Sequence, residues 1–85
     1  MRLDKFLKVS RIIKRRTVAK EVCETGKVLL NGRVAKPGSE VKISDIIEIQ
    51  YATGSIKAEI LDVTEHATKD GAKDLYKIIS GSEIE

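Results

Sequence analysis

The chain has 85 residues, of which 41% are hydrophobic and 34% are charged, a composition typical of one small folded domain over residues 1–85 and not of a disordered protein. Its net charge of +3 is unevenly divided, because residues 1–42 hold 12 basic and 4 acidic residues whereas residues 43–85 hold 4 and 9. One cysteine excludes an internal disulfide, and with no apolar run longer than three residues we expect no membrane span and no secretory signal, but a cytoplasmic protein.

The first predicted helix covers residues 2–10. Apolar side chains recur there at helical spacing and predict a face turned to a core; with Ser10 they are Leu3, Phe6 and Leu7. Asp4 falls in the first turn, where a carboxylate is favoured by the helix dipole. The sequence leaves two roles open for Asp4, which either orients a neighbouring arginine or caps the helix.

A second helix is predicted over residues 18–25. Thr17 is its predicted N-cap, and Gly26 fits the position just past its end, where positive φ is needed. Such a short helix is marginal alone and must pack on the first. Its buried side is predicted to hold Ala19, Val22 and Cys23.

After Gly26 the hydrophobic period changes from that of a helix to that of a strand. Strand-like runs at residues 27–30 and 33–36 flank Asn31-Gly32, a pair that favours the positive φ angles of a tight hairpin turn. Pro37-Gly38 ends this hairpin. Further turns are predicted at Ser44-Asp45 and Thr53-Gly54-Ser55.

The remaining elements complete an α+β fold, with the two N-terminal helices packed on a small antiparallel sheet. Alternation predicts a third strand that contains Ile47, Ile49 and Tyr51. A fourth strand is predicted over residues 56–63, with a bulge near Ile60-Leu61. The helical spacing of Ala72, Leu75, Tyr76 and Ile79 predicts a short C-terminal helix over residues 69–79, followed by a frayed acidic tail at residues 80–85.

The helical region is strongly basic, with eight cations against one acidic residue in residues 1–20. Lys and Arg that replace condensed counterions on phosphates drive binding to nucleic acid. A face that served only solubility would mix both signs of charge, and a membrane-surface helix would need more bulky apolar residues; these remain the alternatives. The cations are Arg2, Lys5, Lys8, Arg11, Lys14, Arg15, Arg16 and Lys20.

The kind of nucleic acid follows from what the helices lack. Neither offers an Asn/Gln cluster for base edges, and the scarce aromatic residues (Phe6, Tyr51 and Tyr76) are expected to pack in the fold and not to stack on bases. Recognition of backbone shape, typical of structured RNA, is therefore expected. We expect no enzyme, cofactor or metal. Cys23 is interpreted as a core residue, with a Cys23–His66 nucleophile and base as the alternative.

The ordered motifs resemble an S4 RNA-binding domain. They are Arg2-Leu3-Asp4, Ser10-Arg11, Ala19, Gly26-Lys27-Val28-Leu29-Leu30-Asn31-Gly32, Lys36-Pro37-Gly38 and Ser44-Asp45-Ile46. The resemblance covers residues 1–51 and implies the S4 fold, with the two helices at the RNA-contacting surface. Since the chain leaves no room for an attached enzyme domain, we expect a stand-alone S4 protein. It is similar to heat shock protein 15 and, through its N-terminal stretch and acidic end, more similar to the RqcP (YabO) family.

The RqcP resemblance implies a role in ribosome-associated quality control. It implies binding to large (50S) ribosomal subunits obstructed by peptidyl-tRNA, contact with both rRNA and tRNA, and support of C-terminal alanine tailing by RqcH, a NEMF-family protein. We expect a monomer on the ribosome. The alternatives are recycling of 50S subunits, as for heat shock protein 15, and a protein-interaction module that uses the acidic half.

Eleven cations are the predicted RNA contacts. The resemblance places Arg2 and Arg16 first, because they match motif positions at the two helix starts. The basic helices add six more, and the hairpin extends the surface. The full set is Arg2, Lys5, Lys8, Arg11, Lys14, Arg15, Arg16, Lys20, Lys27, Arg33 and Lys36.

Overall fold

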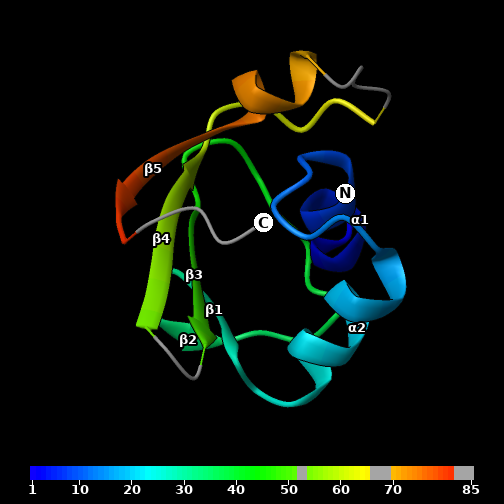
Figure 1. The fold of residues 1–85 in the computed structure, drawn as a ribbon, viewed down its shortest axis with the longest axis vertical. Helices are drawn as coiled ribbons and strands as arrows, with labels where there is room; N and C mark the ends of the chain where they lie inside the picture. Colours follow the sequence, from blue (N-terminus) through cyan, green and yellow to red (C-terminus); the bar gives the residue numbers. More distant parts are fainter. Residues whose placement is uncertain (52–53, 66–69, 82–85) are drawn as a thin grey trace.

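The structure is a computed structural model that describes residues 1–51, 54–65 and 70–81. It has two layers, with helices α1 (Leu3–Val9) and α2 (Arg16–Glu24) on one side and an antiparallel sheet on the other (Figure 1). The predicted α+β fold is therefore confirmed. Within these described ranges, no helix is long and apolar enough to cross a membrane.

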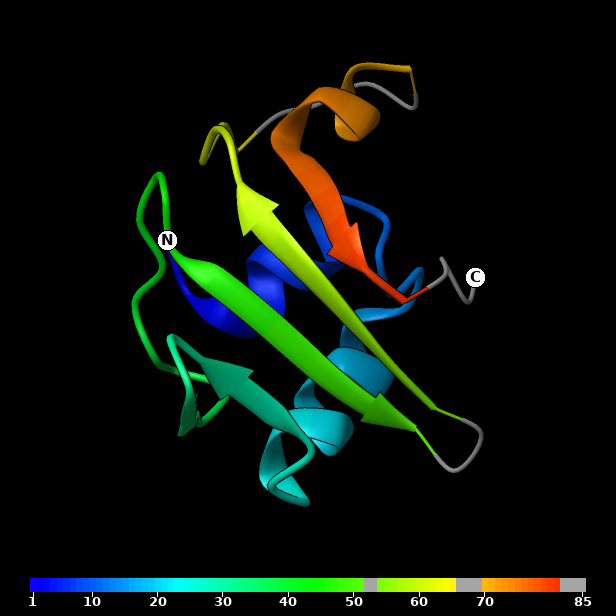
Figure 2. The same ribbon diagram turned by 90° about the vertical axis from the view of Figure 1, so that its left-hand side faces the viewer.

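Five strands form the sheet, in the order β2-β1-β3-β4-β5 with every neighbouring pair antiparallel. The helices lie behind one face of this sheet, and the other face is turned away from them (Figure 2). The strands are β1 (Val28–Leu30), β2 (Arg33–Val34), β3 (Ile46–Tyr51), β4 (Gly54–Ile60) and β5 (Tyr76–Ser80).

The core lies between the two layers. Alternate residues of β3 and β4, such as Ile47, Ile49 and Ile56, are buried in one hydrophobic cluster with the apolar stripe of α1. Phe6, on that stripe, is completely buried. Tyr76 also belongs to the core and Tyr51 packs against it, so the prediction that the aromatic residues serve packing is confirmed.

The β1–β2 hairpin turns at Asn31 and Gly32, which have φ angles of 53° and 83°. This confirms the predicted turn. The Asn31 side chain also links the hairpin to β3, since its Nδ2 donates to Asp45 Oδ1 (3.1 Å) and its Oδ1 accepts from the Ile46 amide (2.9 Å). Asn31 thus forms the turn and also connects the hairpin by hydrogen bonds to the start of β3.

The prediction of a C-terminal helix over residues 69–79 is wrong. A 3₁₀ helix, η1 (Gly71–Leu75), buries Ala72 and Leu75, and the chain then continues as the edge strand β5. The spacing that indicated one helical face instead reports a short turn followed by a strand whose first residue, Tyr76, is also buried. Pairing of β5 with β4, which is distant in sequence, outweighs the local helical pattern.

Three smaller predictions also differ from the structure. The register irregularity lies between Lys57 and Ala58, not near Ile60-Leu61, and β4 ends at Ile60. Thr17 lies inside α2, whose N-cap is Arg15 without a side-chain hydrogen bond. The predictions for Thr53, for His66 and for residues 82–85 of the tail lie outside the described residues.

Candidate nucleic-acid interface

The start of α1 is fixed to the segment that follows the hairpin. The Leu3 amide donates to the Ser39 carbonyl (2.8 Å), and the Asp4 amide donates to the Pro37 carbonyl (3.1 Å). Arg2 forms an isolated antiparallel bridge with Glu40. These main-chain contacts hold Arg2 at the N-cap of α1 with its backbone in a fixed direction.

The start of α2 is fixed by the connector between the helices, residues 10–15. Ile12 and Ile13 are buried, and the Ile13 amide donates to the Leu7 carbonyl (3.0 Å), so the chain turns tightly after α1. Ala19, which is fully buried, faces inward from α2. The two helices therefore pack together, and Arg16, the first residue of α2, comes near the start of α1.

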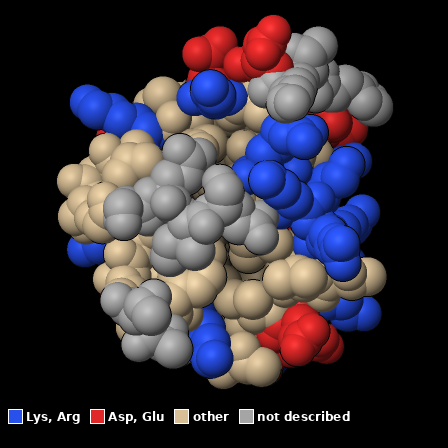
Figure 3. All heavy atoms as spheres, viewed as in Figure 1, with Lys and Arg blue, Asp and Glu red and all other residues tan. Residues whose placement is uncertain are grey.

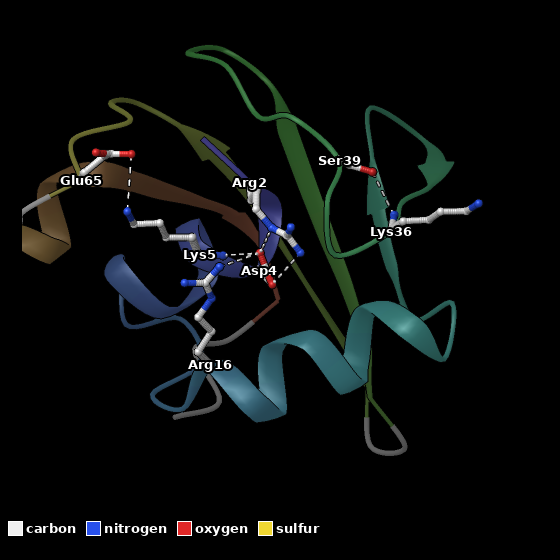
Figure 4. A network of polar contacts seen from close by, with 7 residues as sticks. All are labelled: Arg2, Asp4, Lys5, Arg16, Lys36, Ser39 and Glu65. Carbon is white, nitrogen blue, oxygen red and sulfur yellow. Dashed lines mark hydrogen bonds and ion pairs between the residues drawn. The ribbon is translucent and has the colours of Figure 1, made fainter.

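Asp4 joins these two starts. Its side chain is only 3% exposed and accepts hydrogen bonds from Arg2 Nε (3.1 Å) and Arg2 Nη2 (3.3 Å), while Arg16 Nη2 lies 3.7 Å from Asp4 Oδ1 (Figure 4). Both arginine side chains remain about half exposed. We call Arg2, Asp4 and Arg16 the arginine–aspartate cluster. It presents two guanidinium groups to solvent, of which Arg2 is hydrogen-bonded and Arg16 ion-paired to the same buried carboxylate.

Asp4 performs both roles that the sequence left open, because its Oδ1 also accepts the Lys5 amide of the first helical turn (2.8 Å). Burial raises the pKa of the Asp4 carboxyl, but the hydrogen bonds from Arg2 and Lys5 and the charges of Arg16 and Arg2 outweigh it. The net pKa lies below the usual value, so Asp4 is ionised at neutral pH and holds both guanidinium groups electrostatically.

A concavity of about 430 Å³ opens beside the cluster. Lys5 reaches its rim, where Lys5 Nζ lies 3.4 Å from Glu65 Oε1 (Figure 4). A second hollow, of about 350 Å³, adds Thr17 and Lys20 of α2 to the same arginines. The first concavity is lined by Met1, Arg2, Lys5, Arg16, Gly38, Glu40 and Glu65.

The structure groups some predicted contacts and separates others. Of the eleven cations, ten are exposed and Lys5 is half-buried. Arg2, Lys5, Arg16 and Lys20 gather at the cluster. Lys and Arg side chains gather along the side of the molecule formed by the helices (Figure 3). The other seven lie on the end of α1 and the connector (Lys8, Arg11, Lys14 and Arg15) or on the hairpin and the turn into it (Lys27, Arg33 and Lys36).

Two acidic residues near the cluster were not predicted. Glu65 pairs with Lys5, and Glu40 lines the concavity. Neither position carries a sequence signal, because each comes close to α1 only through the folding of distant segments. The link from Asp4 to Arg16 likewise spans both helices and was not predicted.

Cys23 lies in the core, as predicted, with 2% of its surface exposed. Burial, with smaller contributions from Asp4 and Glu24, raises the pKa of its thiol to about 11. A thiol with this pKa is almost entirely protonated at neutral pH and is a poor nucleophile. Among the residues that the structure describes, no group of three His, Cys, Asp or Glu side chains is arranged to hold a metal ion.

The sequence comparisons agree with this geometry. The S4 domain family matches residues 1–47, which include both helices and the hairpin. The "RQC P-site tRNA stabilizing factor" of Streptococcus pneumoniae is 45% identical over 85 residues, covering 100% of this chain and 97% of that protein. The chain belongs to the S4 domain family and, within it, to the RQC P-site tRNA stabilizing factors. Another factor of this name, from Halalkalibacterium halodurans, is 53% identical over 92% of this chain and 89% of its own length.

The solved structures show the same fold in a related S4 protein. Trimeric heat shock protein 15 of Vibrio cholerae superposes with a TM-score of 0.85 at 31% identity, over 94% of this chain and 82% of that one. The S4 fold expected from the motifs is therefore confirmed. The higher identities belong to the RQC factors, so heat shock protein 15 is a relative of this chain and the RQC factors are its own family.

Proposed function

We propose that this chain binds the P-site tRNA and the rRNA of large (50S) ribosomal subunits obstructed by peptidyl-tRNA, and so supports alanine tailing of stalled chains by RqcH. In this proposal it is a cytoplasmic, ribosome-associated monomer. The names of its relatives support the tRNA part. The rRNA contact, RqcH and the tailing reaction come from the family resemblance.

The arginine–aspartate cluster is the observation that carries the proposal. A guanidinium is a rigid fork that matches two phosphate oxygens, but on a flexible side chain its orientation is lost to rotamer freedom. Here Asp4 orients Arg2 directly and lies 3.7 Å from Arg16, while both side chains remain exposed. Two guanidinium groups held by one carboxylate beside a concavity form a site suited to phosphate oxygens of a nucleic-acid backbone.

The proposed role is that of an adaptor and not of a catalyst. The buried Cys23 thiol, with its raised pKa, does not suit a nucleophile. The cations extend from the cluster to the connector and the hairpin, so a small protein could contact two RNA molecules at once. Holding a tRNA against rRNA requires only such contacts between cations and phosphates, and no reaction.

Co-sedimentation with purified large subunits carrying P-site tRNA tests the proposal. Arg2→Ala and Arg16→Ala should each weaken binding by about tenfold, because each removes a charge-assisted contact to phosphate. Lys77→Ala on β5 is the matched control, since it lowers the net charge equally but lies in the sheet. Circular dichroism would verify folding. Wild-type binding by both arginine variants, or equal loss with Lys77→Ala, would contradict the proposal. Capture of proteins without RNA would favour the protein-interaction alternative.

A further inference from the structure

A groove of about 420 Å³ opens where the edge strand β2 meets the end of α2. One wall is formed by the end of α2 and the turn after it, including Cys23 and Gly26. The other wall is formed by β2 and the segment that follows it, from Val34 to Pro37. β2 is the outermost strand on this side of the sheet (Figure 2). None of the described residues that line the groove belongs to the arginine–aspartate cluster, so the groove is a separate surface.

The lining of this groove is largely apolar. Val34, at 66%, is the most exposed of the large hydrophobic residues in the described ranges, and the nearly buried Ala35 and Cys23 continue the apolar lining. Exposed apolar surface that lines a hollow is typical of binding sites. No aromatic side chain is among the described residues of the lining, so the groove offers no platform for stacking an RNA base. The lining therefore favours an apolar side chain of a protein partner.

The main chain of β2 has an open edge at Val34. In the β1–β2 ladder the Ala35 amide donates to the Val28 carbonyl (2.9 Å), so the preceding residue, Val34, turns its N–H and C=O away from β1. These two groups have no hydrogen-bond partner in the described part of the chain. An unpaired strand edge can be extended by the main chain of an extended peptide.

The charges beside the groove are mostly positive. Lys36 lines it, and its side chain points away from the arginine–aspartate cluster (Figure 4). Lys36 and the exposed Arg33 make no side-chain ion pair with any residue that the structure describes. Glu24, on the opposite wall, is the acidic residue of the described lining. Because Arg33 and Val34 lie on opposite faces of β2, a strand beside them matches both if its acidic and apolar residues alternate.

We propose that this groove binds an extended segment of a partner protein in which acidic and apolar residues alternate. The main chain of the segment pairs with Val34, one of its apolar side chains packs on Val34 in the groove, and a carboxylate meets Arg33 or Lys36. These two cations then serve a protein contact in place of the RNA contact that the sequence predicts for them. The inference goes beyond the proposed function and does not depend on it, since the arginine–aspartate cluster lies at the helix starts.

NMR titration of the isotope-labelled full chain with synthetic peptides tests the proposal. A peptide of alternating valine and glutamate should shift the amide signals of Val34 and Ala35. A peptide of alternating valine and lysine should bind about tenfold more weakly, because like charges then face Arg33 and Lys36. A peptide of alternating serine and glutamate should also bind about tenfold more weakly, because it lacks the apolar anchor.

Val34→Asp should weaken binding of the valine–glutamate peptide by about tenfold, since it removes the apolar contact and adds a like charge. Ile79→Asp on β5 is the matched control, because it makes the same charge change at an exposed residue of the opposite edge strand, and it should bind as the wild type does. Circular dichroism would verify that both variants fold.

Three results would overturn the inference. They are the absence of shifts at Val34 and Ala35 with the valine–glutamate peptide, equal binding of the three peptides, and equal effects of the two variants. A uridine oligonucleotide that shifts these signals when the valine–glutamate peptide does not would assign the groove to RNA instead. None of these results bears on the binding of large subunits by Arg2 and Arg16, so the proposed function is tested separately.

Discussion

The helical layer and the sheet layer of this protein treat their charges differently. On the sheet, opposite charges face each other across strands: Lys57 Nζ lies 3.8 Å from Glu48 Oε1, and Lys77 is in register with Glu59. On the helices and their connector, exposed cations follow one another from Arg2 to Lys20. The buried carboxylate of Asp4 pairs with two of them, and further acidic residues come only at the end of α2, at Glu21 and Glu24. Neighbouring like charges are unfavourable in the free protein. The comparison indicates that the helical layer is built for an anionic partner and the sheet for closing the core.

Phe6→Ala should have the largest effect, because Phe6 is completely buried in the core that joins the two layers. We expect the free energy of unfolding, measured with urea, to fall by about 3–5 kcal/mol. Ile79→Ala on β5 is the control, since Ile79 is 49% exposed and its loss should change stability by less than about 0.5 kcal/mol. Equal effects of the two substitutions would show that the layers do not share this core.

Asp4→Asn separates charge from positioning. It raises the net charge from +3 to +4, so if charge alone governed binding, the variant would bind RNA more tightly. We expect weaker binding instead, by about tenfold at fixed salt, because Arg2 and Arg16 lose the carboxylate that orients them. The unfolding free energy should fall by about 1–3 kcal/mol. Tighter binding of Asp4→Asn would contradict the role given to the cluster.

The sequence predicts local features better than distant ones. The Asn31-Gly32 turn is predicted because two adjacent residues set their own φ angles. The burial of Cys23 follows from helical spacing. The C-terminal helix is predicted wrongly because Ala72, Leu75 and Tyr76 suit either a helix or a turn with a strand, and only pairing with β4 decides between them.

The candidate site follows the same rule. Its cations are visible as a dense basic stretch, and the family motifs draw attention to Arg2 and Arg16. That one carboxylate links both arginines is not visible, because Arg16 reaches Asp4 only after the connector has turned. The end of α1 is hidden for a similar reason. Arg11, which follows the C-cap Ser10, has a φ of 62°, a conformation that glycine and not arginine normally marks in a sequence.

The pH dependence of stability should report the ionisation of Asp4 in the helical layer. Because the pKa of Asp4 is lower in the folded protein, its carboxylate stabilises the fold above the unfolded pKa of about 3.9, and this contribution is lost as the pH falls through the lower folded pKa. The difference in melting temperature between wild type and Asp4→Asn should therefore be largest near neutral pH and shrink below about pH 4. A difference that stays constant between pH 2 and 7 would contradict this assignment.

The smallest expected effect is at Cys23. Because the pKa of this buried thiol is about 11, iodoacetamide at pH 8 should leave the folded protein almost unmodified and should label it readily in urea. Cys23→Ala should bind large subunits as the wild type does. Rapid labelling of the folded protein, or loss of ribosome binding in Cys23→Ala, would contradict the purely structural role of this residue and favour the nucleophile alternative.

The salt dependence of binding tests most directly the claim that the helical layer, and not the sheet, meets RNA phosphates. For a fragment of large-subunit rRNA we predict a log–log slope of about −4 to −5 if about six phosphates are contacted. Arg2→Ala combined with Arg16→Ala should reduce the slope by about two units, whereas Lys57→Ala combined with Lys77→Ala should leave it unchanged. A flat response of the wild type, or equal changes in the two double variants, would contradict the claim.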